Sequence, residues 1–294
     1  MKLYLNAGFG ELINAADLSA ITTLGFCGVR QDIPLTTKDD LALVDQLKDL
    51  SAIFLLGGGN MAGWTKENFI NKTIRISRRI TDYKYFLGRE VYIEIGNEPD
   101  IAVDYWKDSP TRLNEVYWEC YQAAKSINSK IEVVTPGISN LNKRGLEYLD
   151  NFLRDPIPKG AIIGFHRYPN GWDIREPHKG FKSRTQEMLR LKTLAGGRKL
   201  LCTETGVSEG PHTVKTGLFD LCKKTKYLSE EEVANNFRWE SALNHKCGIL
   251  GMTWYQHRDG PSRDALLDNY GIYDYQGQEK VICGIIAEVV TQVA

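Results

Sequence analysis

Short apolar runs alternate with longer amphipathic segments along the whole chain. Eight of these runs have the length of a β-strand, and their Val, Ile and Leu content with little alternation is typical of parallel strands that are buried on both faces. The segments that follow them have the length and the apolar spacing of α-helices. We therefore expect strands at residues 2–6, 28–33, 52–57, 91–97, 131–137, 162–168, 200–206 and 250–256, and helices at residues 11–24, 38–50, 66–86, 112–127, 144–153, 184–195, 230–246 and 281–290.

An eightfold repeat of strand and helix predicts an α/β fold, a closed (β/α)8 TIM barrel that residues 1–294 form as a single domain. A doubly wound open sheet is the alternative with the same order of elements. The length of 294 residues suits one barrel, and no internal repeat, low-complexity tract or proline-rich linker divides the chain.

The charge balance limits the classes of partner. Lys plus Arg and Asp plus Glu both number 37, so no overall field attracts nucleic acid, an anionic membrane or a polyanion. A hydrophobic content of 42% is ordinary for a folded globular protein and excludes wholesale disorder. No stretch approaches the roughly 18 apolar residues that span a bilayer. We expect a monomer that binds a neutral ligand.

The first residues lead straight into an apolar strand and show no signal peptide. This pattern indicates a cytoplasmic protein, or a secreted protein whose signal has been removed. The six cysteines are scattered, with no CxxC pair and no histidine cluster at metal spacing. We expect reduced thiols, which favour a reducing compartment, and neither a metal nor a cofactor.

Candidate chemistry lies at the ends of the predicted strands. Glu98 ends the fourth strand in Asn97-Glu98-Pro99, and Glu204 lies near the end of the seventh strand in the run LLCTETG. The loops after barrel strands meet at one face, where active sites form. Two carboxylates that face each other across a cleft are the arrangement that glycoside hydrolysis needs. The pair predicts a general acid/base at Glu98 and a nucleophile at Glu204.

Polar residues at other strand ends would tune this pair. Arg30 and Tyr168 are candidates to keep Glu204 charged, and His166 points the same way as Tyr168 by the period of two. The alternatives are a structural ion pair between Glu204 and Arg30, a solvated Glu98 at a loop start, and a structural histidine.

Asn97 could donate a hydrogen bond to the sugar hydroxyl beside the scissile carbon. Trp254, at the end of the eighth strand, offers an apolar plane for a pyranose ring, and a buried core tryptophan is its alternative. Further aromatic residues in the same loops could extend this sugar-binding surface, namely Trp64, Tyr105, Trp106 and Trp172.

These residues together resemble glycoside hydrolase clan A, the retaining barrels that include cellulases, mannanases, xylosidases and glucuronidases. The resemblance covers the whole chain. Asn97-Glu98-Pro99 looks like the acid/base strand of the clan, and Glu204 looks like the residue of its nucleophile strand. Three further positions look like the second-strand arginine, the sixth-strand motif and the eighth-strand platform, namely Arg30, His166-Arg167-Tyr168 and Trp254. The resemblance implies a retaining β-glycoside hydrolase that cleaves a β-linked oligo- or polysaccharide by double displacement. The additional histidine that many cellulase-like members carry after the acid/base is missing here, and the substrate stays open.

Two other readings remain. A catalytically silent barrel could keep the site only to bind carbohydrate. A metal-assisted barrel could use Glu98 and Glu204 as ligands, with Asp100 and Asp259 as further candidates. Within the hydrolase reading, the shortage of long insertions favours an open groove and endo action. The basic stretch at residues 212–226 is either a contact for an acidic sugar or a solvated surface loop.

Overall fold

The computed structural model describes residues 1–8, 12–35, 40–58, 61, 63–82, 88–102, 106, 109–169, 173–216, 222–262 and 269–293. Within this part of the chain, eight parallel strands form one sheet in the order β5-β4-β3-β2-β1-β10-β7-β6. The strands are β1 (Lys2–Gly8), β2 (Gly28–Ile33), β3 (Ser51–Leu56), β4 (Val91–Ile95), β5 (Glu132–Val134), β6 (Ile163–Arg167), β7 (Leu200–Thr205) and β10 (Gly251–Trp254).

The sheet closes on itself between β5 and β6. The amide of Thr135 donates to the carbonyl of Ile162 at 2.9 Å, and the amide of His166 donates to that of Ile138 at 2.9 Å. Parallel bridges at Val134–Ile162 and Ile138–Phe165 mark the same seam. The closed barrel confirms the predicted (β/α)8 architecture over the open sheet.

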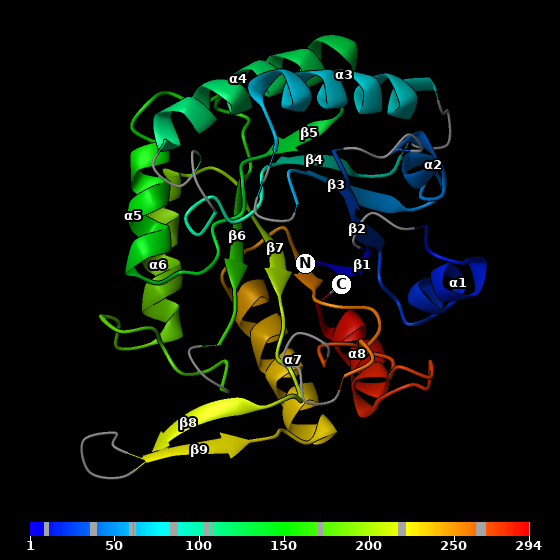
Figure 1. Ribbon diagram of the computed structural model, residues 1–294, viewed down its shortest axis with the longest axis vertical. Helices are drawn as coiled ribbons and strands as arrows, with labels where there is room; N and C mark the ends of the chain where they lie inside the picture. Colours follow the sequence, from blue (N-terminus) through cyan, green and yellow to red (C-terminus); the bar gives the residue numbers. More distant parts are fainter. Residues whose placement is uncertain are drawn as a thin grey trace.

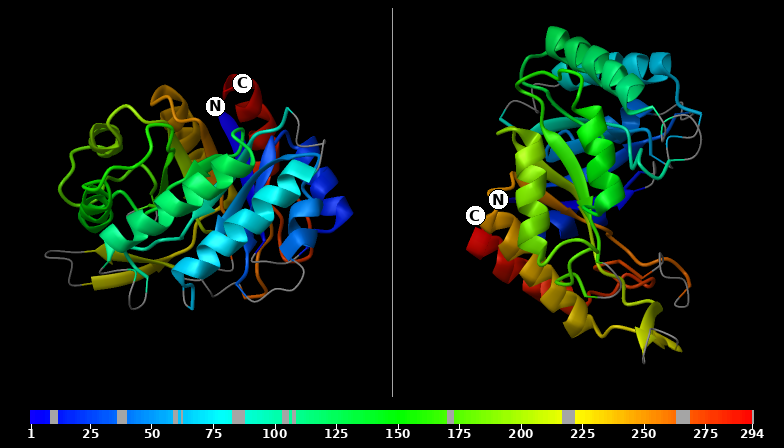
Figure 2. Two further views of the ribbon diagram at one scale, coloured as in Figure 1. Left: turned by 90° about the horizontal axis from the view of Figure 1, so that it is seen from above. Right: turned by 90° about the vertical axis from the view of Figure 1, so that its left-hand side faces the viewer.

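The helices surround the barrel (Figures 1 and 2). Each predicted helix has a counterpart, and the limits of two of them, 184–195 and 230–246, agree with the prediction. The helices are α1 (Ala15–Thr23), α2 (Asp40–Asp45), α3 (Lys66–Asp82), α4 (Pro110–Ile127), α5 (Lys143–Phe152), α6 (Arg184–Ala195), α7 (Glu230–Lys246) and α8 (Val281–Val293).

Two apolar layers result from the period of two in the strands. One set of side chains, including Phe54 and Ile93, packs outward against the helices. The other set fills the barrel interior. Every residue of β3 and β4 is buried, as the apolar runs predict. The interior cluster consists of Tyr4, Ile53, Tyr92, Val134, Ile162 and Leu201.

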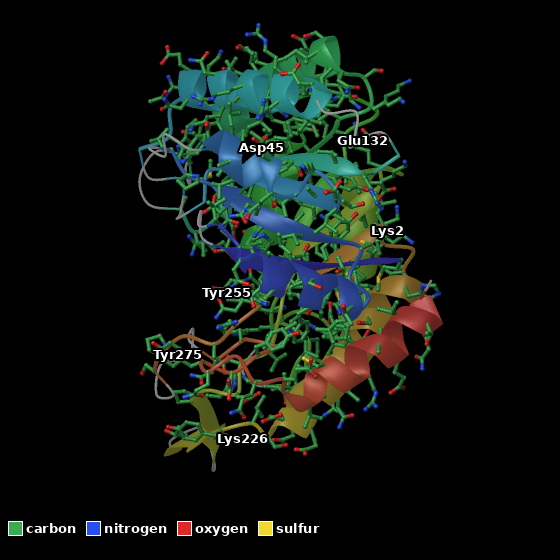
Figure 3. The ribbon with its side chains drawn as sticks, turned by 90° about the vertical axis from the view of Figure 1, so that its right-hand side faces the viewer. Lys2, Asp45, Glu132, Lys226, Tyr255 and Tyr275 are labelled. Atoms are coloured by element: carbon green, nitrogen blue, oxygen red, sulfur yellow. The ribbon has the colours of Figure 1, made fainter. Side chains whose placement is uncertain are left out.

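Figure 3 shows that the amino ends of the strands, marked by Lys2 and Glu132, lie on the side of the barrel opposite Tyr255, which follows the carboxyl end of β10. The loop between β7 and α7 contains an unexpected hairpin of β8 (His212–Thr216) and β9 (Cys222–Lys226). This hairpin, which includes the basic stretch predicted as a loop, projects from the barrel (Figures 1 and 2).

The five cysteines whose side chains are described, Cys27, Cys120, Cys202, Cys247 and Cys283, are free thiols, as the sequence predicts. None of the described helices combines the length and the apolar character needed to cross a membrane.

Candidate active site

The two predicted carboxylates meet at the carboxyl end of the barrel. Glu98 follows β4 and Glu204 belongs to β7, and an oxygen of one lies within 4.8 Å of an oxygen of the other. Both side chains are largely buried, with 18% of Glu98 and 13% of Glu204 exposed. They therefore form one narrow site that is still open to a ligand.

Glu204 faces the site because β7 contains one residue more than its neighbour β6. Phe165 pairs with Cys202, whereas the next residue of β6, His166, pairs with Glu204. Since Leu201 faces the interior, regular alternation would turn Glu204 outward toward the helices. The irregularity is a β-bulge, which re-aims the side chain into the barrel.

Glu98 has an unusual backbone conformation for a residue with a side chain. Its φ is +45°, in the left-handed region that non-glycine residues seldom adopt. The amide of Glu98 donates to the carbonyl of Gly137 at 2.8 Å, so the segment after β5 helps to hold this conformation. Backbone strain of this kind is common at functional sites.

Arg30 of β2 connects the residues around the pair. Its Nη1 donates to Glu204 at 2.9 Å, its Nη2 to Oδ1 of Asn97 at 3.0 Å, and its Nε to Glu94 at 2.8 Å. Burial opposes the charge of this guanidinium, but Glu94 and Glu204 raise the pKa of Arg30. One planar fork thus fixes Glu204 and leaves the amide NH₂ of Asn97 as the group that it can offer to a ligand.

Tyr168 holds the second oxygen of Glu204. Its hydroxyl donates to Oε1, and burial together with the charge of Glu204 raises the pKa of Tyr168 well above its ordinary value, so the phenol stays protonated. Its ring makes edge-on contacts with Tyr255 and Tyr270 at centroid distances of 6.5 and 6.0 Å. The three tyrosines form an aromatic wall beside Glu204.

His166 holds Glu98. Its Nδ1 lies 2.9 Å from Oε1 of Glu98, and its Nε2 lies 3.9 Å from Oε1 of the fully buried Glu94. Burial disfavours an imidazolium, yet the charges of Glu204, Glu94 and Glu98 raise the pKa of His166 to about 10. Burial would likewise neutralise Glu94, but Arg30 and His166 lower its pKa to about 2.

Four of the predicted ligand-binding residues are brought together with the carboxylates: Arg30, Asn97, His166 and Tyr168. The ion pair between Arg30 and Glu204, considered above as an alternative to a catalytic role, is present inside the same site.

Among the described residues, the predicted tryptophans Trp64, Trp106 and Trp254 do not join this group. Trp254 is fully buried and packs edge-on against Phe237 of α7, at 5.0 Å between ring centroids. Trp106 is buried against Phe69 of α3, as is Trp64. These contacts suit core packing, which the sequence left open for Trp254. Trp172 and Tyr105 lie outside the described residues.

Three residues of the site were not anticipated: Glu94, Tyr255 and Tyr270. Glu94 could have been noticed as the single charged residue in the buried run VYIEI, because a buried charge needs a partner. For Tyr255 the missing information was the phase of β10. Since Trp254 points outward, the next residue points inward.

A cation could in principle be held by Glu98, His166 and Glu204, whose ligand atoms lie within 4.8 Å of one another. Arg30 and His166 already supply positive charge at these positions. Asp100 instead accepts hydrogen bonds from Ser139, and Asp259 pairs with Lys280 at 2.6 Å. The wider acidic ligand set considered from the sequence is therefore engaged elsewhere.

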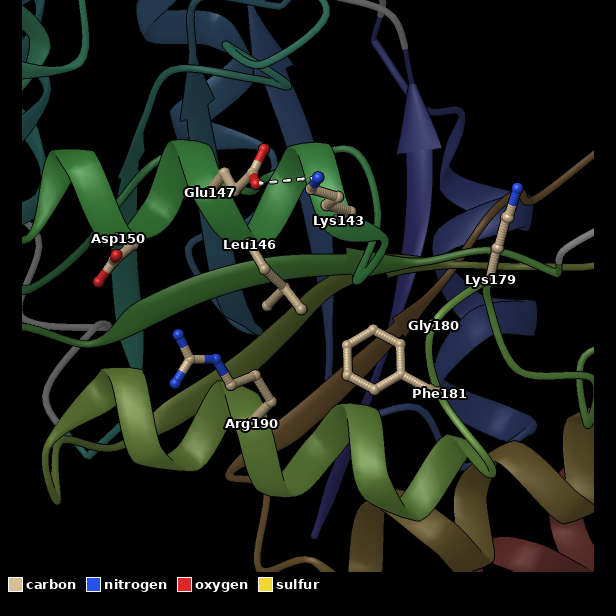
Figure 4. Close-up of a pocket in the computed structure, with 8 residues that line it drawn as sticks. All are labelled: Lys143, Leu146, Glu147, Asp150, Lys179, Gly180, Phe181 and Arg190. Carbon is tan, nitrogen blue, oxygen red and sulfur yellow. Dashed lines mark ion pairs between the residues drawn. The ribbon is translucent and has the colours of Figure 1, made fainter.

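A separate hollow of about 350 Å³ lies on the outer surface between α5 and α6 (Figure 4). Its walls carry charges of both signs, and none of its lining residues contacts the carboxylate pair in the interactions described above. The lining residues are Lys143, Leu146, Glu147, Asp150, Lys179, Gly180, Phe181 and Arg190.

At the level of sequence, no family model and no curated protein matches this chain. Solved structures do match. The GH5_18 protein from Bifidobacterium longum subsp. longum, solved in complex with Manβ1-4GlcNAc, is 14% identical with a TM-score of 0.69, covering 99% of this chain and 78% of that one.

Two further structures match over 99% of this chain. An exo-β-1,4-mannosidase from an Opitutaceae bacterium is 15% identical with a TM-score of 0.65, and 59% of that chain is covered. A family 39 glycoside hydrolase from Bacteroides cellulosilyticus is 16% identical with a TM-score of 0.68, and 63% of that chain is covered. The chain thus spans about three fifths of the length of these two proteins. It has the (β/α)8-barrel fold of these glycoside hydrolases.

Proposed function

We propose that the protein is a retaining β-glycoside hydrolase, with Glu98 as general acid/base and Glu204 as nucleophile. The observation that carries the proposal is the approach of the two carboxylates to within 4.8 Å. Retaining enzymes place their two carboxyl groups about 5–5.5 Å apart, whereas inverting enzymes need about 6.5–9.5 Å to admit a water molecule.

The surroundings support this division of roles. Arg30 and Tyr168 both donate to Glu204, and such donors stabilise the carboxylate that must attack the anomeric carbon. Glu98 lies against His166 instead, a partner that can exchange a proton with it. One carboxylate is thus prepared for attack and the other for proton transfer.

In the first step Glu204 attacks the anomeric carbon while Glu98 gives its proton to the departing glycosidic oxygen. In the second step Glu98 takes a proton from water, and the resulting oxygen nucleophile displaces Glu204 from the sugar. Both displacements invert the anomeric carbon, so the product keeps the β configuration. Asn97 would donate to the adjacent hydroxyl, and the wall of Tyr168, Tyr255 and Tyr270 would face the sugar ring.

The matching structures include proteins described as a β-1,4-mannosidase, a β-xylosidase and a glucosidase. We therefore propose a β-linked, uncharged glycan as the substrate. Aryl β-mannosides, β-xylosides and β-glucosides, followed by β-1,4-linked polysaccharides, form the informative panel. Release of internal fragments would indicate endo action in an open groove.

The decisive test compares Glu204→Gln, Glu98→Gln and Glu240→Gln. Glu240 is a fully buried carboxylate that pairs with Arg167 and serves as the matched control. We expect Glu204→Gln to abolish turnover and Glu98→Gln to slow the cleavage of poor leaving groups most, with Glu240→Gln remaining active. The first-formed anomer, followed by NMR, should be β. Full activity of Glu204→Gln, or an α product, contradicts the proposal.

Two measurements separate this proposal from the alternatives. An activated 2-fluoro sugar should attach covalently to Glu204, as peptide mass spectrometry would show, whereas a silent binding barrel would bind sugar without being labelled. Hydrolysis should also persist in EDTA, which a metal-assisted enzyme would not tolerate.

A further inference from the structure

Glu94 binds the partner of one carboxylate of the site and lies near the partner of the other. Its Oε2 accepts from Arg30, which in turn donates to Glu204. Its Oε1 faces Nε2 of His166, which in turn contacts Glu98. No solvent reaches Glu94 or His166. A single buried carboxylate thus stands at the junction of two arms, one to the nucleophile and one to the acid/base.

Carboxylates near both ring nitrogens of His166 favour its protonated form. Nδ1 lies at hydrogen-bond distance from Glu98, at 2.9 Å, whereas Nε2 lies 3.9 Å from Oε1 of Glu94, which is too long for a hydrogen bond but close enough for a charge interaction. Within the described part of the chain, Nε2 of His166 and Oε1 of Glu94 have no hydrogen-bond partner. Gly137 leaves room for the ring, since a Cβ there would lie 2.4 Å from Nε2.

We propose that Glu94 is a positioning residue which, through His166 on one side and Arg30 on the other, sets the protonation of the carboxylate pair. The inference deepens the proposed function and rests on it for its catalytic consequence. Its electrostatic part concerns only Glu94 and His166 and can be measured without any substrate.

The charges around His166 come from several elements. Glu94 lies in β4 and Glu98 follows it, Glu204 comes from β7, and Arg30 of β2 is bound to two of these three carboxylates. The hydroxyl of Tyr168 adds a neutral donor. Asp32 of β2 also interacts with Arg30, Glu94 and Glu204, so four negative groups surround two positive ones when all are ionised.

Removing the charge of Glu94 weakens proton binding at every other member of this cluster. His166 loses one of its two neighbouring carboxylates, so the imidazolium releases its proton at lower pH. Arg30 no longer divides its charge between two carboxylates, so it stabilises the charged form of Glu204 more strongly. Both changes have the same sign because one negative charge has left a buried site.

The first test follows the imidazole itself. The chain has five histidines, and His166→Gln identifies the resonance of His166 in an NMR titration of the labelled rings. We expect His166 to stay protonated to high pH in the wild type and to titrate at least one pH unit lower in Glu94→Gln. Glu240→Gln, which removes a buried carboxylate of α7 that pairs with Arg167 of β6, should leave the titration unchanged. An unmoved His166 titration in folded Glu94→Gln overturns the proposal.

The second test follows the reaction. In Glu94→Gln both limbs of the pH profile of kcat/KM should move toward lower pH, while a purely structural loss would lower the whole profile without moving it. Glu94→Asp retains the charge and should give a smaller shift of both limbs and of the His166 titration. Thermal unfolding of each variant confirms that it is folded, and Glu94→Asp carries the test if Glu94→Gln is not.

The two tests distinguish failure of the role of Glu94 from failure of the proposed function. A shifted His166 titration in a protein that hydrolyses no glycoside would uphold the electrostatic role of Glu94 and refute the proposed function. Hydrolysis with an unshifted titration and an unshifted pH profile would do the reverse.

Discussion

Individual side chains of this site form hydrogen bonds with several partners at the same time. Glu204 is bound at both oxygens, by Arg30 and by Tyr168. This double restraint fixes the orientation of the carboxylate, as the proposed attack on the anomeric carbon requires, and hydrogen bonds to a charged group contribute about 1.5–3 kcal/mol each. The contribution of each donor can be measured by removing it alone.

We expect Tyr168→Phe to lower kcat roughly 10- to 100-fold, because one charge-assisted hydrogen bond to Glu204 is lost while the ring remains. Steady-state kinetics on an aryl β-glycoside measures this. Tyr117→Phe is the matched control, since it removes a buried phenol that donates to the carbonyl of Val133 at 3.0 Å. That variant should lose about 1 kcal/mol of stability and keep its kcat. Equal kinetics for the two variants would contradict the role of Tyr168.

A second prediction concerns Asp32, two residues beyond Arg30 in β2. Burial raises the pKa of Asp32 to about 6, against the opposing influence of Arg30. The unfolded chain ionises this group near its ordinary value, so the contribution of Asp32 to the free energy of unfolding falls as the pH rises from about 4 to 6. Asp32→Asn should therefore stabilise the protein at pH 7.5, by on the order of 2 kcal/mol.

Urea unfolding at pH 7.5 and near pH 4 checks this prediction. The stabilisation should vanish near pH 4, where Asp32 is protonated in the folded state and half protonated in the unfolded chain. Asp49→Asn changes an exposed carboxylate and should have little effect at either pH. Equal stability of Asp32→Asn and the wild type at pH 7.5 would contradict the prediction.

The sequence predicted most of the site but not all of it. Glu98 and Tyr168 could be found because each follows the end of a strand, whereas Arg30, which the sequence placed at a strand end, lies within β2. Trp254 and Tyr255 are neighbours, and which of them faces the interior depends on the phase of β10, which its apolar pattern does not reveal. Glu94 was missed because it lies inside a strand, and its role depends on partners that are distant in the sequence.

Among the elements, β7 does most to bring the carboxylates together. Its extra residue turns Glu204 inward, and the sequence LLCTETG contains no visible sign of a bulge. The helices were easier to predict because their starts are marked locally. Ser183 caps α6, and Ser229 forms a capping box with Glu232 in α7. The hairpin of β8 and β9 was not predicted because the sequences of its strands are polar and basic and lack the apolar run typical of a strand.

The junction of α2 and α3 allows a buried and a half-exposed carboxylate to be compared. Asp40 is fully buried, accepts a hydrogen bond from Lys72 at 2.8 Å and forms an ion pair with Arg75 at 2.9 Å. Asp45 pairs with Arg79 at 2.6 Å, and both are about one third exposed. We expect Asp40→Asn to cost about 1–3 kcal/mol and Asp45→Asn less than about 1 kcal/mol.

Chemical denaturation of the two variants at low and moderate salt measures this difference. Only the small effect of Asp45→Asn should shrink further with salt, because exposed pairs are screened more than buried ones. Activity should be unchanged in both, since these helices lie on the outside of the barrel. Equal losses of stability would show that burial does not determine how much each of the two carboxylates contributes to stability.

At the scale of the whole molecule, the barrel is a closed unit to which the hairpin is attached. Among the described strands, β8 and β9 pair only with each other. His212 and Lys226 lie directly opposite each other at its base. A two-stranded hairpin contributes little stability of its own, so its removal should leave the barrel intact.

We expect a variant in which residues 213–225 are replaced by an Asn-Gly turn to fold, with Tm lowered by only a few degrees. Thermal unfolding measures the stability, and kinetics on a short aryl glycoside and on a polysaccharide measure the function. Unchanged kinetics on both substrates would indicate a surface feature, whereas a raised KM for the polysaccharide alone would assign the hairpin to substrate binding. Loss of folding would show that the barrel depends on the hairpin.

The shared contacts of Arg30 also predict a combination of residues by which homologues of this protein can be recognised without relying on overall identity. A guanidinium that serves three acceptors cannot be exchanged for lysine, whose compact ammonium lacks the planar spread of donors. Arg30, Glu94 and Glu204 should consequently be inherited as a set. In an alignment of distant homologues, loss of Glu94 should coincide with replacement of Arg30 or His166, and independent variation at these positions would show that the contacts are dispensable.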